Sequence, residues 1–373
     1  MSRSEFVNTK RVVIKIGSSL LTCGGQGLDK IAIAAWVKQM AGLKLQGIDV
    51  VLVSSGAVAE GMCRLNLKVR PKTLHELQAA AAIGQMGLVR VFDDNFQQHD
   101  LHAAQILLTH DDLSNRKRYL NARSTLLTLI NFGAVPIINE NDTVATEEIR
   151  FGDNDTLAAL VANLIEADLL IILTDQKGLF TSDPSVNPDA TLISEISVND
   201  TRLESMAGES RSGLGRGGMY TKVRAARLAS RSGAATIVAA GIVDDVIKKV
   251  LAGENLGTHF LPDAEPLVSR KRWLAGQLQL KGQLTLDSGA ARALKNEGKS
   301  LLSVGVKVVL GQFERGELVA CVDEAGVEIA RGLINYSKVE AQLIAGKNSS
   351  EFESILGYLD DRELIHRDNM VLI

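Results

Sequence analysis

The sequence predicts an α/β protein: a three-layer, doubly wound, mainly parallel sheet with helices on both faces, followed by a small β-barrel-like module. Short apolar strands alternate with helix-length segments as far as about residue 260, which is typical of right-handed β-α-β units. Beyond residue 280, short strands separated by glycine turns replace this alternation. With 373 residues and 46% hydrophobic content, the chain is long enough for two domains.

The domain limits follow from composition. Pro262, Pro266 and the basic run 270–272 are typical of a linker. We therefore expect a sheet domain at 1–262, a linker at 263–280, and a C-terminal module with its tail at 281–373.

Several function classes are disfavoured. A net charge of −3 argues against a nucleic-acid-binding surface. Residues 1–11 contain no apolar signal-peptide core, and the apolar run 169–173 is far too short to span a bilayer. The three cysteines form no Cys-x-x-Cys pair, which favours a reducing compartment and gives neither a disulfide framework nor a zinc site. We expect a soluble cytoplasmic protein and assign no metal-ligating residues.

The first predicted strand, 12–19, is rich in β-branched residues but contains Lys15. Such a lysine either keeps an edge strand soluble or delivers a charge to the end of a buried strand. Because the flanking residues are apolar on both sides, as in a strand covered on both faces, we favour the second interpretation.

A helix capped by Asp29 is predicted next, with a buried stripe, followed by strand 49–53. The strand runs directly into the turn Ser54-Ser55-Gly56-Ala57 at the start of another helix. Backbone N–H groups at such a turn can bind an anion, although an ordinary small-residue turn has the same appearance. The stripe expected on the first helix consists of Ile31, Ala34, Val37 and Ala41.

The middle of the chain continues the alternation, with helices at 74–98, 119–131 and 156–165 and strands at 104–109, 135–138 and 169–173. Polar clusters occupy the segments 139–142, 152–155 and 174–175. One such aspartate is commonly only a helix cap. Several clusters together predict a ligand site, because the carboxyl ends of parallel strands share one edge of the sheet.

A glycine-rich stretch, 212–222, carries four glycines in six positions and opens a predicted helix at 219–233. Unpaired N–H groups and the positive end of the helix dipole make this a phosphate site, with Lys222 in the first turn; a mobile surface linker is the alternative. The dinucleotide fingerprint is rejected because no strand precedes the stretch. Strands are also expected at 192–196, at 235–239 and near 260, with a helix from 243.

Two lysines, two anion-binding turns and several carboxylates at one sheet edge predict phosphoryl transfer. Lys15 and Lys222 would flank the moving phosphoryl group, and Asp155 would hold both ammonium groups. Carboxylate or phosphate oxygens would share Mg²⁺. The sequence contains no Walker A, His-Arg-Asp or Asp-Phe-Gly motif, so neither P-loop nor protein-kinase architecture fits.

The chain resembles the amino-acid kinase family over essentially its whole length, and the module after residue 280 resembles a PUA domain. The segments that carry the resemblance are 12–19, 53–57, 139–142, 152–155, 173–179 and 212–222. The resemblance implies the amino-acid kinase fold. It also implies that ATP, with Mg²⁺, phosphorylates the side-chain carboxylate of L-glutamate to L-glutamyl 5-phosphate, the first step of proline biosynthesis.

The resemblance also implies residue roles. Arg216 and Tyr220 depart from the expected threonine and small residue, which bears on nucleotide affinity. Catalytic roles fall to Lys15, Lys222 and Asp155; glutamate-binding roles to Ser55, Gly56, Asp142 and Asn154; and nucleotide-binding roles to Lys15, Thr174, Asp175, Arg216, Gly217, Gly218, Met219, Tyr220, Thr221 and Lys222.

The family further implies feedback inhibition by proline at or near the glutamate site, and a homo-oligomer. Two alternatives stay open. A sibling enzyme would phosphorylate acetylglutamate, aspartate, carbamate or UMP. A PUA protein could instead bind RNA, but residues 281–373 carry 11 Lys and Arg against 14 Asp and Glu, so phosphate-driven binding is expected to be weak.

Overall fold

The computed structural model describes residues 1–22, 27–145, 154–208, 218–262, 280–359 and 361–373. These divide into two compact units, Met1–Leu113 with Asn121–Ser269, and Ser114–Leu120 with Arg270–Ile373. Nearly all of the predicted linker, 263–280, lies outside the described residues, so its limits stay a prediction. None of the described helices is both long and apolar enough to cross a membrane.

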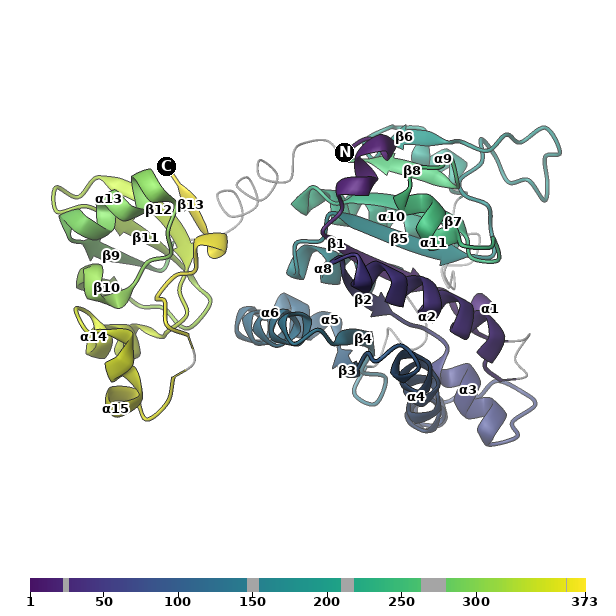
Figure 1. The fold of residues 1–373 in the computed structure, drawn as a ribbon, viewed down its shortest axis with the longest axis horizontal. Coiled ribbons are helices and arrows are strands. Elements are labelled where there is room, and N and C mark those ends of the chain that lie inside the picture. Colours follow the sequence, from purple (N-terminus) through teal and green to yellow (C-terminus); the bar gives the residue numbers. More distant parts are fainter. Residues whose placement is uncertain (23–26, 146–153, 209–217, 263–279, 360) are drawn as a thin grey trace. The chain divides into compact units, whose positions relative to one another are not determined.

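The first unit is built on a sheet with the strand order β3-β4-β2-β1-β5-β7-β8-β6 (Figure 1). Neighbouring strands are parallel except for β7 and β8, which pair antiparallel. The predicted, mainly parallel sheet is therefore confirmed. The strands are β1 (Arg11–Ile16), β2 (Asp49–Val53), β3 (Ala103–Leu108), β4 (Val135–Glu140), β5 (Leu169–Thr174), β6 (Glu195–Ser197), β7 (Ala235–Ala240) and β8 (Thr258–Leu261).

Helices cover both faces of this sheet. On one face α2 packs against α4 and α11; on the other, α8 packs against α10 and β1. The described helices before residue 262 are η1 (Arg3–Asn8), α1 (Ser18–Leu21), α2 (Lys30–Leu45), α3 (Ala57–Arg64), α4 (Leu74–Gln97), α5 (His110–Ser114), α6 (Arg116–Asn131), α8 (Asn154–Leu164), α9 (Leu203–Met206), α10 (Met219–Ala229), η2 (Ser230–Ser232) and α11 (Val246–Leu251).

Strand alternation decides where Lys15 points. Its neighbours Ile14 and Ile16 belong to the buried core that also includes Ile33 and Val37 of α2. Because successive strand residues face opposite sides of a sheet, Lys15 projects toward the α8 and α10 side. The sequence-based preference for a buried strand that carries a charge is confirmed, since β1 lies between β2 and β5.

Some expected boundaries were wrong. The first strand ends at Ile16, and Ser18–Leu21 forms the short helix α1. The strand expected at 192–196 begins at Glu195, and the helix expected from 243 begins at Val246. These ends depend on tertiary pairing, which short apolar runs do not specify.

The stripe predicted for α2 was partly wrong. Asp29 does cap the helix, accepting a hydrogen bond from Ala32 N at 2.9 Å. Ile31, however, is 85% exposed, whereas Ile33 is fully buried. Apolar residues occur on both sides of this helix, so periodicity alone did not select the buried side.

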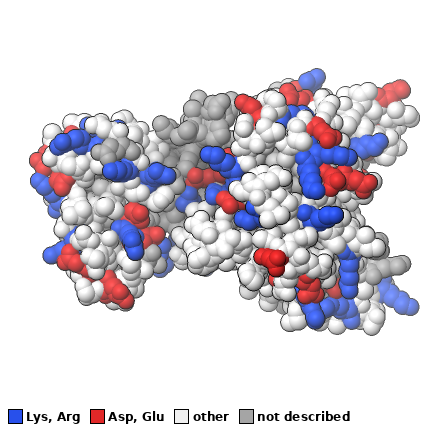
Figure 2. All heavy atoms as spheres, viewed as in Figure 1, with Lys and Arg blue, Asp and Glu red and all other residues white. Residues whose placement is uncertain are grey.

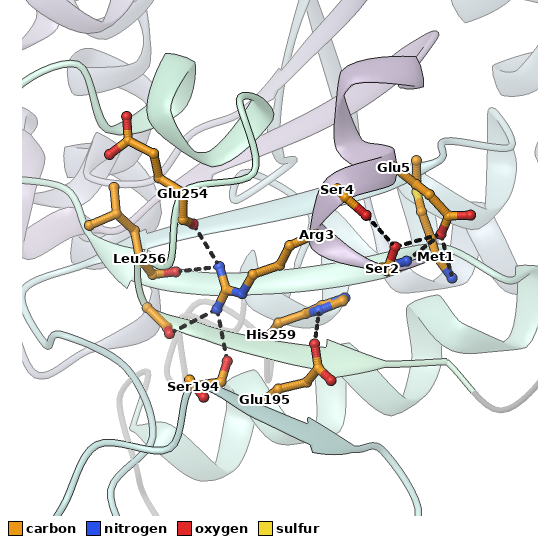
Figure 3. Close-up of polar contacts among 11 residues, drawn as sticks. Met1, Ser2, Arg3, Ser4, Glu5, Ser194, Glu195, Glu254, Leu256 and His259 are labelled. Carbon is orange, nitrogen blue, oxygen red and sulfur yellow. Dashed lines mark hydrogen bonds and ion pairs between the residues drawn. The ribbon is translucent and has the colours of Figure 1, made fainter.

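The N-terminal turn η1 packs against the edge of the sheet formed by β6 and β8 (Figure 3). The Arg3 guanidinium donates hydrogen bonds of 2.8–3.1 Å to four backbone carbonyls. Phe6 packs edge-on against the buried His259 ring, 5.0 Å between centroids, and His259 Nδ1 lies 3.1 Å from Glu195 Oε2. The four carbonyls belong to Ser194, Glu254, Leu256 and Gly257.

The second unit contains a mixed sheet with the order β10-β9-β11-β12-β13, in which only β9 and β11 pair in parallel. Its core includes Leu284, Val319, Ile329 and Phe352. The strand β13 and the helix α15 were not predicted. The described elements are β9 (Gly282–Leu286), α13 (Ser288–Glu297), η3 (Ser303–Gly305), β10 (Val306–Gly311), β11 (Leu318–Val322), β12 (Glu328–Leu333), α14 (Lys338–Ile344), η4 (Ser349–Glu351), α15 (Phe352–Leu356), η5 (Arg367–Asn369) and β13 (Met370–Leu372).

Charged residues of both signs are intermixed on the face of this unit that Figure 2 shows. Basic side chains pair locally with acids, as in Lys307 with Glu324 and Arg315 with Asp361. A surface that binds phosphate backbones instead gathers basic residues on one face or along one stripe. The face in view therefore gives no support to an RNA-binding function.

Candidate active site

One buried carboxylate contacts two lysines that lie far apart in the sequence of the first unit. Asp155 Oδ1 lies 2.6 Å from Lys15 Nζ, and Asp155 Oδ2 lies 3.1 Å from Lys222 Nζ. Lys15 comes from the end of β1, Asp155 from the start of α8 and Lys222 from the first turn of α10. The side chains of Lys15, Asp155 and Lys222 are 6%, 1% and 5% exposed, so water screens these charges little.

Burial and charge act in opposite directions on these groups. Burial alone would raise the pKa of Asp155, but the two ammonium groups and a hydrogen bond from Thr221 lower it to about 2. Burial lowers the pKa of Lys222, and the negative charge of Asp155 acts in the opposite direction, to raise it. Two lysines and one aspartate give the trio a formal charge of +1, which suits it to attract an anion.

The start of α10 adds backbone donors beside the trio. Gly218 is the N-cap of α10, and the Thr221 hydroxyl lies 2.7 Å from Asp155 Oδ2 and 2.8 Å from the carbonyl oxygen of Gly218. The first N–H groups of a helix lack partners within the helix and lie at the positive end of the helix dipole. The rest of the predicted loop, 212–217, with Arg216 and Gly217, lies outside the described residues.

The end of β5 approaches the same place. The Thr174 hydroxyl donates to Asp175 Oδ1 at 3.0 Å, and the negative charge of Asp175 acts on Lys222. The N–H of Gly17, just after β1, donates to the carbonyl oxygen of Leu173 at 3.1 Å. The predicted nucleotide residues Thr174 and Asp175 therefore lie on the lysine side of the sheet edge.

The turn after β2 depends on glycines. Gly56 has φ of +95°, a conformation that side chains rarely tolerate, and it begins α3. A Cβ on Gly84 of α4 would lie 1.8 Å from the carbonyl oxygen of Ala57, and one on Gly61 would lie 1.7 Å from that of Ala80. The close packing of α3 on α4 therefore fixes the position of the Ser55 and Gly56 amides.

A chain of amide side chains connects this turn to α4. Asn154 Nδ2 donates to the carbonyl oxygen of Ser54 at 2.6 Å and to Asn139 Oδ1 at 2.8 Å. Asn139 Nδ2 in turn donates to Gln85 Oε1 at 2.6 Å. No individual role was predicted for Asn139, although it lies in the polar cluster 139–142, and none for Gln85, which lies in a helix rich in alanine and glycine.

A groove of about 460 Å³ opens beside these amides, between α4 and the ends of β3 and β4. Gln85, Met86, Leu107, Glu140 and Asp142 are among its lining residues. Burial raises the pKa of Asp142 to about 6, with Arg70 acting in the opposite direction. Asp142 is thus ionised at neutral pH inside a partly desolvated groove, where it can attract a cationic group.

Models of two known families match this chain. A model of the amino acid kinase family matches residues 10–240, and a PUA domain model matches residues 282–356. This chain belongs to the amino acid kinase family. The resemblance inferred from the sequence motifs, and with it the amino-acid kinase fold and the PUA module, is confirmed.

Curated members of this family match the whole chain. Glutamate 5-kinase of Methylococcus capsulatus is 63% identical over 371 residues, covering 100% of this chain and 99% of that protein. The glutamate 5-kinases of Stutzerimonas stutzeri and Pseudomonas aeruginosa PAO1 are each 59% identical over 371 residues, covering both chains completely.

The three residues that the sequence predicts to be catalytic are in contact in the described site, and their roles stay a prediction. Lys15, Asp155 and Lys222 form one cluster, and Asn154 joins it to the turn before Ser55. Asp142 lines the neighbouring groove. Within the described residues, no group of three or more His, Cys, Asp or Glu side chains is placed to hold a metal ion by itself.

Proposed function

We propose that this chain transfers the γ-phosphoryl group of ATP to the side-chain carboxylate of L-glutamate, producing L-glutamyl 5-phosphate and ADP. This is the first step of proline biosynthesis, and we place it in the cytoplasm. Full-length similarity to curated glutamate 5-kinases supports the substrate. The single structural observation that carries the chemistry is the pair of buried lysines on one carboxylate.

The lysine pair supplies what phosphoryl transfer requires. Negative charge on the transferred group is spread over its peripheral oxygens, and fixed positive charge in a dry site stabilises it. Lys15 and Lys222 would contact those oxygens, while Asp155 orients both ammonium groups. The attacking carboxylate is already ionised, so no general base is needed.

Nucleotide binding falls to the start of α10 and the end of β5. The N–H groups of the first turn of α10 would bind phosphate oxygens, and Thr174 and Asp175 would contact the nucleotide from its other side. Thr221 would act partly through Asp155, because its hydroxyl lies within hydrogen-bond distance of that carboxylate. Mg²⁺ fits this set because it is typically bound by one or two carboxylates together with substrate phosphates and several waters, and it would neutralise phosphate charge.

Glutamate would be held along the turn after β2 and in the groove. Asp142 would pair with the α-ammonium group, and the N–H groups after Ser54 would bind a carboxylate. Both hydrogens of Asn154 Nδ2 are used by Ser54 and Asn139. Its side chain therefore offers Oδ1, a hydrogen-bond acceptor that suits an ammonium group better than a carboxylate.

Two finer features belong to this proposal. Proline has an α-ammonium and an α-carboxylate but no side-chain carboxylate, so it would compete with glutamate at the groove and inhibit the enzyme. We also propose a homo-oligomer. Raising the glutamate concentration should relieve proline inhibition, and light scattering should give a mass that is a multiple of 40.1 kDa. Inhibition that is independent of glutamate, or a monomeric mass, would overturn these points.

The substrate is tested by an ADP-release assay with L-glutamate, acetylglutamate, aspartate, carbamate and UMP as acceptors. We expect kcat/KM to be highest with L-glutamate. A higher kcat/KM with any other acceptor would assign the chain to a sibling activity within the same family.

A further inference from the structure

The orientation of the Gln85 amide is fixed by its neighbours. Asn139 Oδ1 receives the backbone N–H of Glu140 at 2.9 Å and Nδ2 of Asn154 at 2.8 Å. A backbone N–H can only donate, so the Asn139 atom it meets must be the oxygen. The other Asn139 atom is therefore Nδ2, and its partner 2.6 Å away must be an acceptor, Gln85 Oε1.

This assignment leaves the nitrogen of Gln85 with two hydrogens to donate. Gln85 is only 8% exposed, and its Nε2 has no hydrogen-bond partner in the part of the chain that the structure describes. Buried donors are nearly always satisfied, so one without a protein partner at a groove points to a ligand. Gln85 lines the same groove as Asp142.

We propose that Gln85 Nε2 donates to the α-carboxylate of the amino-acid acceptor while Asp142 pairs with its α-ammonium group. A carboxylate oxygen needs a donor and an ammonium group needs an acceptor, and the groove provides both. The side-chain carboxylate cannot be the partner of Gln85, because it must reach the lysine pair. Gln85 is separated from that pair by Asn139 and Asn154 in the amide chain.

Gln85 is therefore a binding residue with two separate contacts. Its Oε1 holds Asn139, and its Nε2 contacts the substrate. The substitution Gln85→Glu separates these roles, because a carboxylate still accepts from Asn139 Nδ2 but has no hydrogen for the acceptor and repels its α-carboxylate. This inference rests on the proposed glutamate kinase activity.

The test compares two acceptors that both carry a free side-chain carboxylate: L-glutamate and its α-amide, L-isoglutamine. For the wild-type enzyme we expect glutamate to have the higher kcat/KM. In Gln85→Glu, the KM for glutamate should rise about 10-fold or more, the cost of a lost hydrogen bond to a charged group. The preference for glutamate over isoglutamine should shrink or reverse, because the carboxylate introduced by this substitution accepts from the amide of isoglutamine.

The chain offers a matched control. Gln105 of β3 lines the same groove but is exposed, so Gln105→Glu adds the same charge without removing a buried donor. We expect Gln105→Glu to leave the ratio of the two kcat/KM values unchanged. An equal change in both variants, or an unchanged ratio in Gln85→Glu, would overturn the assignment of Gln85.

Two further measurements keep the test decisive. If Gln85→Glu does not fold, Gln85→Met, which has no donor and a similar length, should still raise the KM for glutamate and reduce the preference for it. A Gln85→Met enzyme with wild-type KM would overturn the inference. Failure of the wild-type enzyme to phosphorylate glutamate would instead contradict the proposed function.

Discussion

The substitution Asp155→Asn tests the charge balance of the site. Asparagine keeps the shape of the side chain but leaves two buried ammonium groups without their counter-charge. The lowering of the Asp155 pKa from 3.8 to about 2 corresponds to a stabilisation of about 2–3 kcal/mol, at ~1.4 kcal/mol per pKa unit. Breaking a buried ion pair typically costs about 3–5 kcal/mol. We therefore expect the free energy of unfolding to fall by about 2–5 kcal/mol.

The sign of the pH dependence follows from the same pKa. Because the pKa is lowered in the folded state, the stabilisation is complete above the unfolded value of 3.8 and is lost as the pH falls through about 2. The variant can relieve its excess charge by deprotonating Lys222, whose pKa burial already lowers. That relief removes a charge needed for phosphoryl transfer, so kcat should fall by about 10²-fold or more.

Urea unfolding and an ADP-release assay measure the two effects. The control is Asp94→Asn, which removes an exposed ion pair with Arg90, 3.7 Å long with side chains 60% and 77% exposed. An exposed pair of this kind contributes less than about 1 kcal/mol. If Asp155→Asn resembles the control in unfolding midpoint and in kcat, the account of the buried trio is refuted.

Three further predictions concern packing, pH and domain organisation. Gly84→Ala places a Cβ 1.8 Å from the carbonyl oxygen of Ala57, so it should lower the free energy of unfolding by about 1–3 kcal/mol and raise the KM for glutamate. In the control Gly87→Ala, the nearest neighbours of the new Cβ are side-chain atoms, so the free energy of unfolding should fall less. Equal unfolding midpoints for the two variants would contradict this prediction. Since the pKa of Asp142 is about 6, the KM for glutamate should rise by up to about 10-fold per pH unit below that pH as the carboxylate is protonated. A KM for glutamate that stays constant from pH 5 to 7 would contradict the proposed pairing of Asp142 with the ammonium group. A chain truncated after residue 280 should keep glutamate kinase activity, and a folded but inactive fragment would contradict the predicted domain limits.

The lysine trio was predictable because each member lies in a recognisable local pattern. Lys15 interrupts an apolar strand, Asp155 begins a helix, and Lys222 follows a glycine-rich loop. Strand-helix alternation predicts a parallel sheet, whose strand ends converge on one edge. Local sequence was therefore enough to infer that residues far apart in the chain meet.

The part of Gln85 in the amide chain could not be predicted in the same way. Gln85 lies in a helix, α4, whose alanine-rich sequence predicts only packing. Its contact with Asn139 depends on the position of α4, which packs closely against α3 at Gly84. The antiparallel direction of β8 and the exposure of Ile31 were also hidden, because neither strand direction nor the choice between two apolar helix sides is encoded in short-range periodicity.

The most direct test is a crystal structure of the enzyme with ADP, Mg²⁺, L-glutamate and aluminium fluoride, which imitates the phosphoryl group in transfer. We predict that Nζ of Lys15 and Nζ of Lys222 both lie within about 3 Å of its fluorine atoms, with Asp155 still between them. A structure in which either ammonium group faces away from the fluoride would contradict the role of the paired lysines.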